Sequence, residues 1–177
     1  MPGDSVSIRD ATEDDLATIQ AIYAHHVDHG LASFEEIPPD LAEISRRRDV
    51  ARDHDLPYLV AERDGAVRGF AYASPFRNRP AYRYTIEDSV YVAPDALGAG
   101  IGSALLSVLI ERCTERGFRQ MVAVIGDSAN QASIELHAKH GFLQSGLMPA
   151  VGFKFGRWVD SVRMQRPLGP GDTTLPE

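Results

Sequence analysis

The sequence has little cysteine and fewer basic than acidic residues. One cysteine among 177 residues excludes a disulfide framework and argues against a zinc site built from thiolates. Lys and Arg number 18 against 25 Asp and Glu, a formal net charge of −7. Proteins that bind nucleic acid or an anionic membrane through their charge need a basic face. We therefore expect neither nucleic acid nor a membrane as a partner.

Long apolar runs are also missing. No run approaches the ~18 residues of a membrane span, and the opening MPGDSVSIRD lacks the basic start and apolar segment of a signal peptide. We therefore expect a cytoplasmic protein. The length suits a single domain, which we expect over residues 1–166. The end of the chain, 167–177, is rich in Pro, Gly and Thr and is expected to be a flexible tail.

Apolar spacing and turn residues predict four helices and about seven strands. Helices are expected after a capping box at Thr12, from about Asp40, and over 100–116 and 130–140. Asp64-Gly65 is typical of a tight hairpin turn. The predicted strands cover 6–9, 57–62, 67–73, 83–92, 121–125, 142–146 and 158–165. This order predicts an α/β fold of the mixed α+β kind, with a twisted, mostly antiparallel sheet and one parallel crossover.

A glycine-rich turn follows the predicted strand 83–92. Gly98, Gly100 and Gly102 stand where the strand gives way to a helix, so backbone N–H groups at the helix start could bind a phosphate. Ser103 replaces the third glycine of a dinucleotide fingerprint, and no Lys-Ser or Lys-Thr follows as in a P-loop. The glycines alone leave a plain strand–turn–helix connection as the alternative.

Two motifs resemble the GCN5-related N-acetyltransferase superfamily. The segment Leu97-Gly-Ala-Gly100-Ile-Gly102 resembles its cofactor motif Arg/Gln-x-x-Gly-x-Gly/Ala and departs from it at Leu97. The segment Asn130-x-x-Ser133-x-x-Leu136-His137-x-x-x-Gly141-Phe142 resembles its second motif. The blocks 82–92 and 152–160 resemble the phosphinothricin acetyltransferase branch, which includes enzymes that acetylate methionine sulfoximine and methionine sulfone.

This resemblance implies the fold of that superfamily and direct transfer of acetyl from acetyl-CoA to the amine of a small amino-acid-like substrate, in a homodimer with a role in detoxification. It implies Glu87 as the general base, on the strand before the glycine turn. It implies His137 as a second catalytic group that protonates the departing thiolate or helps to deprotonate the amine. The alternatives are a strand carboxylate paired with Arg83 or Arg79, and a packed helix histidine bonded to a carbonyl.

Residues for the two substrates also follow from the resemblance. The backbone of Val90, Tyr91 and Val92 is expected to pair with the pantetheine arm, and Asn130 to anchor that arm or to cap its helix. The pyrophosphate is expected at Gly98, Ala99, Gly100, Ile101, Gly102 and Ser103. For the acceptor we expect Arg77, Arg79 and Tyr82, with Phe34 as an apolar wall. A solvated basic loop is the alternative for the arginines.

Other reactive residues have plainer interpretations. Cys113 falls on the apolar side of a predicted helix and is expected in the core. His25, His26 and His29 are expected on a solvated or dimer-facing surface, and no metal site is expected, because a third ligand is missing. Lys154 and Trp158 could close the site, and Trp158 could equally be a core aromatic.

Two alternative functions remain open. One is the same chemistry on another amine, such as a polyamine, an antibiotic or a protein N-terminus. The other is a non-catalytic sensor that binds acetyl-CoA.

Overall fold

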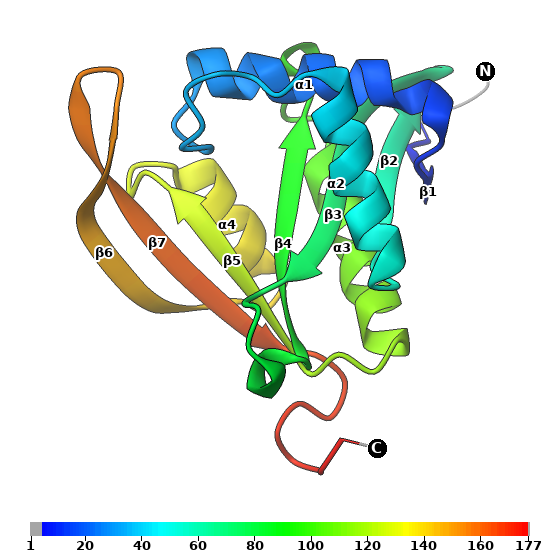
Figure 1. The fold of residues 1–177 in the computed structure, drawn as a ribbon, viewed down its shortest axis with the longest axis vertical. Coiled ribbons are helices and arrows are strands. Elements are labelled where there is room, and N and C mark those ends of the chain that lie inside the picture. The colour runs from blue at the N-terminus through cyan, green and yellow to red at the C-terminus, as the bar shows by residue number, and fades with distance from the viewer. Residues whose placement is uncertain (1–4, 177) are drawn as a thin grey trace.

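Seven strands form one sheet in the order β1-β2-β3-β4-β5-β7-β6 in a computed structural model that describes residues 5–176 (Figure 1). Only β4 and β5 pair in parallel, and every other neighbouring pair is antiparallel. The predicted mixed, mostly antiparallel sheet is therefore confirmed. The strands are β1 (Ser7–Asp10), β2 (Tyr58–Arg63), β3 (Ala66–Pro75), β4 (Thr85–Val92), β5 (Gln120–Gly126), β6 (Leu143–Lys154) and β7 (Arg157–Pro167).

Four α-helices flank the sheet and begin where local capping residues predict. Asp40 accepts a hydrogen bond from the Glu43 N–H at the start of one helix, and Asn130 accepts one from the Ser133 N–H at the start of another. Thr12 and Asp15 form the predicted capping box. The helices are α1 (Leu16–His29), α2 (Leu41–Asp53), α3 (Ile101–Glu115) and α4 (Gln131–Lys139).

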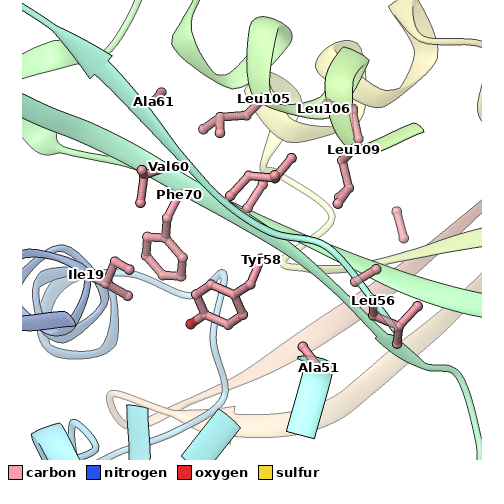
Figure 2. Close-up of a cluster of buried hydrophobic side chains, with 14 of the residues drawn as sticks. Ile19, Ala51, Leu56, Tyr58, Val60, Ala61, Phe70, Leu105, Leu106 and Leu109 are labelled. Atoms are coloured by element: carbon pink, nitrogen blue, oxygen red, sulfur yellow. The ribbon is translucent and has the colours of Figure 1, made fainter. Parts of the chain in front are cut away.

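The helices form two layers. Figure 1 shows α2 in front of β2 and β3, with α3 and α4 behind the sheet. Figure 2 shows Leu105 and Leu109 of α3 on one side of the strands, and Ile19, Tyr58 and Phe70 on the other. These side chains are buried, so the sheet is packed on both faces. Cys113 lies in the same core, where burial raises the pKa of its thiol to about 12.

Two boundaries differ from those expected. Strand β6 runs over Leu143–Lys154 rather than 142–146, because its side chains are mostly exposed and lack the apolar alternation that marks a half-buried strand. The expected domain boundary at residue 166 falls within β7, and Leu168 beyond it is buried. Arg119 donates to the carbonyls of Gly171 and Leu175. The mobility of the tail stays a prediction.

Over residues 5–176, no helix combines the length and the apolar character that crossing a bilayer requires.

Candidate active site

The site begins where two parallel strands separate. β4 pairs with β5 only from Thr85 to Asp88, opposite Gln120 to Ala123. The next residues of each strand flank a cleft of about 550 Å³, which is lined by Val90, Tyr91 and Val92 on one side and by Gly126, Asn130 and His137 on the other. Backbone groups that a neighbouring strand would otherwise occupy face this cleft, so an extended ligand can pair with β4 there.

The glycine turn lies at the end of this cleft. Gly98 has φ +76° and Gly100 has φ +78°, a left-handed conformation that glycine adopts without steric cost. Gly100 is the N-cap of α3 and makes no side-chain cap, so the first N–H groups of that helix are available to an anion. Leu97, which departs from the resembled motif, is 65% exposed and lines the cleft.

The structure thus brings the expected cofactor residues to one end of the sheet. A Cβ at Gly102 would lie 3.5 Å from side-chain carbons of Val92 and Leu136, both of which line the cleft. The hydroxyl of Ser103 lies 2.8 Å from His140 Nε2 and is hydrogen-bonded within the protein.

Glu87 lies on the opposite face of β4 from α3. Its Cα partners are Ser74 on β3 and Val122 on β5. Burial raises the pKa of its carboxyl, the negative charge of Asp88 raises it further, and Arg163 opposes the shift. Within residues 5–176 Glu87 has no ion-pair partner, and Arg83 instead stacks on Tyr84. The salt-bridged alternative therefore does not describe this carboxylate, which is suited to accept a proton.

His137 is buried and both of its ring nitrogens are occupied. Nδ1 donates to the carbonyl of Ser133 over 2.7 Å, and Nε2 donates to Asp88 Oδ2 over 2.9 Å. Burial alone lowers the pKa of this imidazole, but the hydrogen bond and charge of Asp88 outweigh it and the pKa is raised. Both ring nitrogens are thus hydrogen-bonded within the protein, as the alternative of a packed helix histidine expects, and the catalytic role of His137 stays a prediction.

The expected acceptor residues lie in two places. Arg77 stacks on Phe76 and Tyr82. Arg77, Arg79 and Tyr82 line a cavity of about 420 Å³ near the start of β4. Phe34 instead lies against Gly152 and Gly126, where its ring atoms would be 2.5 Å and 3.0 Å from an added Cβ. The structure therefore gathers Arg77, Arg79 and Tyr82 and leaves Phe34 beside the cleft.

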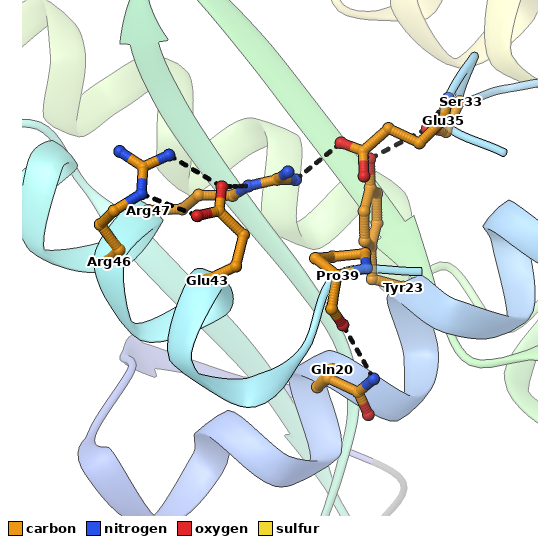
Figure 3. A network of polar contacts seen from close by, with 8 residues as sticks. All are labelled: Gln20, Tyr23, Ser33, Glu35, Pro39, Glu43, Arg46 and Arg47. Atoms are coloured by element: carbon orange, nitrogen blue, oxygen red, sulfur yellow. Dashed lines mark hydrogen bonds and ion pairs between the residues drawn. The ribbon is translucent and has the colours of Figure 1, made fainter. Parts of the chain in front are cut away.

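A polar network holds the loop that carries Phe34 (Figure 3). Arg47 of α2 pairs with Glu35 of the loop and with Glu43 of its own helix, at 2.9 Å and 2.8 Å. The hydroxyl of Tyr23 donates to Glu35 and lies 2.9 Å from the hydroxyl of Ser33. The loop between α1 and α2 is thereby tied to both helices.

Lys154 holds the same loop from the other end of the chain. Its side chain is 2% exposed, and Nζ donates to the carbonyls of Val27, Gly30 and Ser33 at 2.7, 2.9 and 2.8 Å. The only feature of the sequence that pointed to Lys154 was its position between two glycines, in the segment Gly152–Gly156. Trp158 nearby is 66% exposed and packs on Phe153, so it is not a core aromatic.

The histidines of α1 divide into two kinds. The rings of His25 and His29 stack at 4.6 Å. His26 is half-buried, and its Nε2 donates to the carbonyl of Val92 over 2.8 Å. It therefore supports the cleft rather than a solvated surface. Across the described range, no three His, Cys, Asp or Glu side chains are grouped as metal ligands would be.

Comparison with known proteins gives a consistent result. Residues 19–142 match the family model described as acetyltransferase (GNAT) family. Phosphinothricin N-acetyltransferase of Alcaligenes faecalis is 58% identical over 171 residues, which cover 97% of this chain and 87% of that protein. An L-methionine sulfoximine/L-methionine sulfone acetyltransferase of Pseudomonas aeruginosa is 46% identical over 167 residues, covering 94% of this chain and 96% of that protein.

A solved structure agrees with these relatives. The phosphinothricin acetyltransferase of Sinorhizobium meliloti in complex with AcCoA superposes with a TM-score of 0.94 and 52% identity, over 97% of this chain and 93% of that one. The family match covers more than half of the chain and includes the separated strands, the glycine turn and Glu87. The chain therefore belongs to the acetyltransferase (GNAT) family.

Proposed function

We propose that this protein transfers the acetyl group of acetyl-CoA to the primary amine of a small amino-acid-like acceptor, namely phosphinothricin, methionine sulfoximine or methionine sulfone. The observation that carries the proposal is the cleft between β4 and β5, with a helix N-terminus at its end and the buried carboxylate of Glu87 on β4. The relatives named for these acceptors support the choice of substrates.

Acetyl-CoA is proposed to lie along the separated strands. Its amides would pair with the backbone of Val90, Tyr91 and Val92, and its pyrophosphate would meet the N–H groups between Gly98 and Ser103. Asn130, which already caps α4, lines the same cleft. The S. meliloti relative in complex with AcCoA supports this placement.

Glu87 is proposed as the general base. An amino acid arrives as an ammonium ion and must lose a proton before its nitrogen attacks the thioester carbonyl. A C–N bond then forms, the C–S bond breaks, and CoA leaves as a thiolate that takes up a proton. A carboxylate whose pKa is raised by burial holds the abstracted proton better than an exposed one.

His137 has a supporting role in this proposal. Its Nε2 donates to Asp88, where the pairing of β4 with β5 ends, and its Nδ1 donates to the Ser133 carbonyl of its own helix. Arg77, Arg79 and Tyr82 stay predictions as acceptor residues, with Phe34 as a wall beside the cleft.

We also propose a cytoplasmic homodimer. Strands β6 and β7 expose large apolar side chains, which a second copy could cover. They are Leu143, Leu147, Val151, Phe153 and Trp158. The molar mass in solution from light scattering tests this: twice 19.4 kDa supports the dimer, and 19.4 kDa contradicts it.

The substrate class is tested by measuring thiol release from acetyl-CoA with a panel of amines. The panel holds phosphinothricin, methionine sulfoximine, methionine sulfone, spermidine and a short peptide. Fast release with the first three supports the proposal. Faster release with spermidine or the peptide would assign the same chemistry to another amine. Binding of acetyl-CoA without release across the panel would leave a non-catalytic sensor.

A further inference from the structure

Arg163 is a cation on the same face of the sheet as Glu87, and sequence reasoning did not single it out. On β7 its Cα partner is Val124 of β5. Val122, two residues earlier on β5, is the Cα partner of Glu87. Directly paired residues share a face, and so do residues two apart on one strand. The side chains of Glu87 and Arg163 therefore project from one face, on either side of β5.

The hydrogen-bond donors of the Arg163 guanidinium find few partners in the protein. Its Nε is buried and lacks a hydrogen-bond partner anywhere in residues 5–176. One of its terminal nitrogens donates to the sulfur of Met148 at 3.6 Å, and a thioether is a weak acceptor. Buried donors in folded proteins are almost always paired, so this one indicates a ligand group.

The side chains of Glu87 and Arg163 interact through their charges but form no ion pair within residues 5–176. The positive charge of Arg163 acts on Glu87, yet no ion pair between them is formed over the described residues. A carboxylate and a guanidinium that project from one face of the sheet without forming an ion pair present the complement of a zwitterion. An α-amino acid carries its ammonium and its carboxylate on one carbon, so the two groups reach such a pair together.

This face is also open to a ligand. The main contacts of α1 and α2 with the sheet are to β2, β3 and β4, and Figure 1 shows no helix in front of β5 and β7. Val124, between the two charged residues, is 41% exposed. An acceptor can therefore reach Glu87 from this side, while the acetyl-CoA cleft opens between the strands.

We infer that Arg163 binds the carboxylate of an α-amino acid acceptor and so directs the amino group to Glu87, which makes it a specificity-determining residue. The inference rests on the proposed acetyl transfer to amino-acid-like amines. Arginine binds carboxylates through two parallel hydrogen bonds, and one of these can use the Nε that the protein leaves unpaired. An amine that lacks the carboxylate forms no such hydrogen bonds with Arg163, so its kcat/KM does not depend on this residue.

The test compares two acceptors that differ only in the carboxylate: methionine sulfone and 3-(methylsulfonyl)propan-1-amine. Thiol release from saturating acetyl-CoA gives kcat/KM for each with the wild type, Arg163→Gln, Arg163→Lys, Arg79→Gln and Arg112→Gln. Arg112 of α3 pairs with Asp10 of β1 and controls for the loss of one positive charge. Circular dichroism and the thermal midpoint establish that each variant is folded.

Arg163→Gln is expected to lower kcat/KM for methionine sulfone by at least about 10-fold and that for the amine by less than about 3-fold, because charged hydrogen bonds are lost only with the acid. Arg163→Lys should recover part of the loss. An equal loss for both acceptors, no loss, or a carboxylate preference lost only in Arg79→Gln would overturn the inference.

A binding readout separates this inference from the proposed function. If the wild type releases no thiol, the proposed acetyl transfer fails. Calorimetry with methionine sulfone alone then tests whether Arg163 binds this amino acid. Binding to the wild type that Arg163→Gln abolishes supports the amino-acid site. Absence of binding, or equal binding to both proteins, overturns it.

Discussion

Asp88 Oδ2 lies 2.9 Å from His137 Nε2, in a buried pair that joins β4 to α4 behind the cleft. The second oxygen of Asp88 is buried and has no partner among the described side chains and backbone. The pair sits at Asp88, the last residue of β4 that is paired with β5. It therefore fixes the point at which the two strands separate and the cleft begins.

This pair predicts a fall in stability with rising pH. The pKa of His137 is raised above its usual 6.5 in the folded protein, so the folded state holds this proton more tightly than the unfolded state. Its contribution is complete below about pH 6.5 and is lost as pH rises through the raised pKa. Urea unfolding at pH 6 and pH 8.5 isolates this contribution as the difference between the wild type and Asp88→Ala, because the lowered pKa values of His26 and His140 act in the opposite direction.

Asp88→Ala should remove most of that pH dependence and cost about 3–5 kcal/mol at pH 6, because it leaves a buried imidazolium unpaired. His25→Ala, at a half-buried position of α1, is the control and should leave the dependence intact. A dependence that survives Asp88→Ala would show that another group causes it.

Lys154→Met should destabilise the protein and loosen the loop between α1 and α2. The ammonium satisfies three backbone carbonyls of that region, and charged hydrogen bonds each contribute about 1.5–3 kcal/mol. We expect a loss of about 3 kcal/mol or more in the free energy of unfolding by urea. Lys139→Met, at an exposed position of α4, should change it by less than about 0.5 kcal/mol. Similar small losses in both variants would rule out this role of Lys154.

Gly102→Ala should weaken acetyl-CoA binding while the fold stays intact. A Cβ at Gly102 meets other atoms only at ordinary contact distance, 3.5 Å, but it points toward the cleft residues Val92 and Leu136. Gly100→Ala differs, because a side chain at φ +78° is strained by roughly 1–2 kcal/mol. Thermal unfolding and calorimetry with acetyl-CoA should therefore give a stable Gly102→Ala with reduced affinity. Unchanged affinity would place the cofactor elsewhere.

Leu97→Arg should tighten acetyl-CoA binding by roughly 5-fold at low salt. Leu97 is exposed at the end of the cleft, where a guanidinium would reach the pyrophosphate with about 1 kcal/mol of net gain. The gain should shrink at 0.5 M salt, since exposed charges are screened. Leu97→Gln offers a polar side chain without the charge and should show no salt-dependent gain. Equal affinities for Leu97→Arg and wild type at low salt would contradict the expected phosphate position.

Local patterns predicted the helices well because their start signals are local. The side chains of Asp40 and Asn130 each accept a hydrogen bond from the N–H group three residues later. Both helix starts can therefore be predicted from a few consecutive residues. Strand β6 was predicted too short because its exposed face carries Leu143, Leu147 and Phe153 without alternation. Its pairing with β7, rather than its own composition, makes it a strand.

The residues of the site also divide into those that a local motif predicts and those that only the sheet topology brings together. Glu87 and the glycine turn were predictable from motifs that are continuous in sequence. Lys154 donates to Val27 across 127 positions, and Arg163 meets the face of Glu87 only through the order β4-β5-β7. Such contacts depend on the topology of the sheet, which no short segment contains. The contact of His137 with Asp88 spans 49 positions and was likewise not predicted, while the catalytic role of His137 stays a prediction.

Glu87→Gln tests the central claim most directly, with thiol release from acetyl-CoA and methionine sulfone measured from pH 5.5 to pH 9. The account predicts a fall in kcat of about 10²- to 10⁴-fold, unchanged acetyl-CoA affinity, and a higher thermal midpoint at pH 7. The midpoint rises because the raised pKa of Glu87 means that its ionised form destabilises the fold above that pKa. A Glu87→Gln enzyme with the kcat and pH profile of the wild type would contradict the account, and the base would then have to be sought elsewhere.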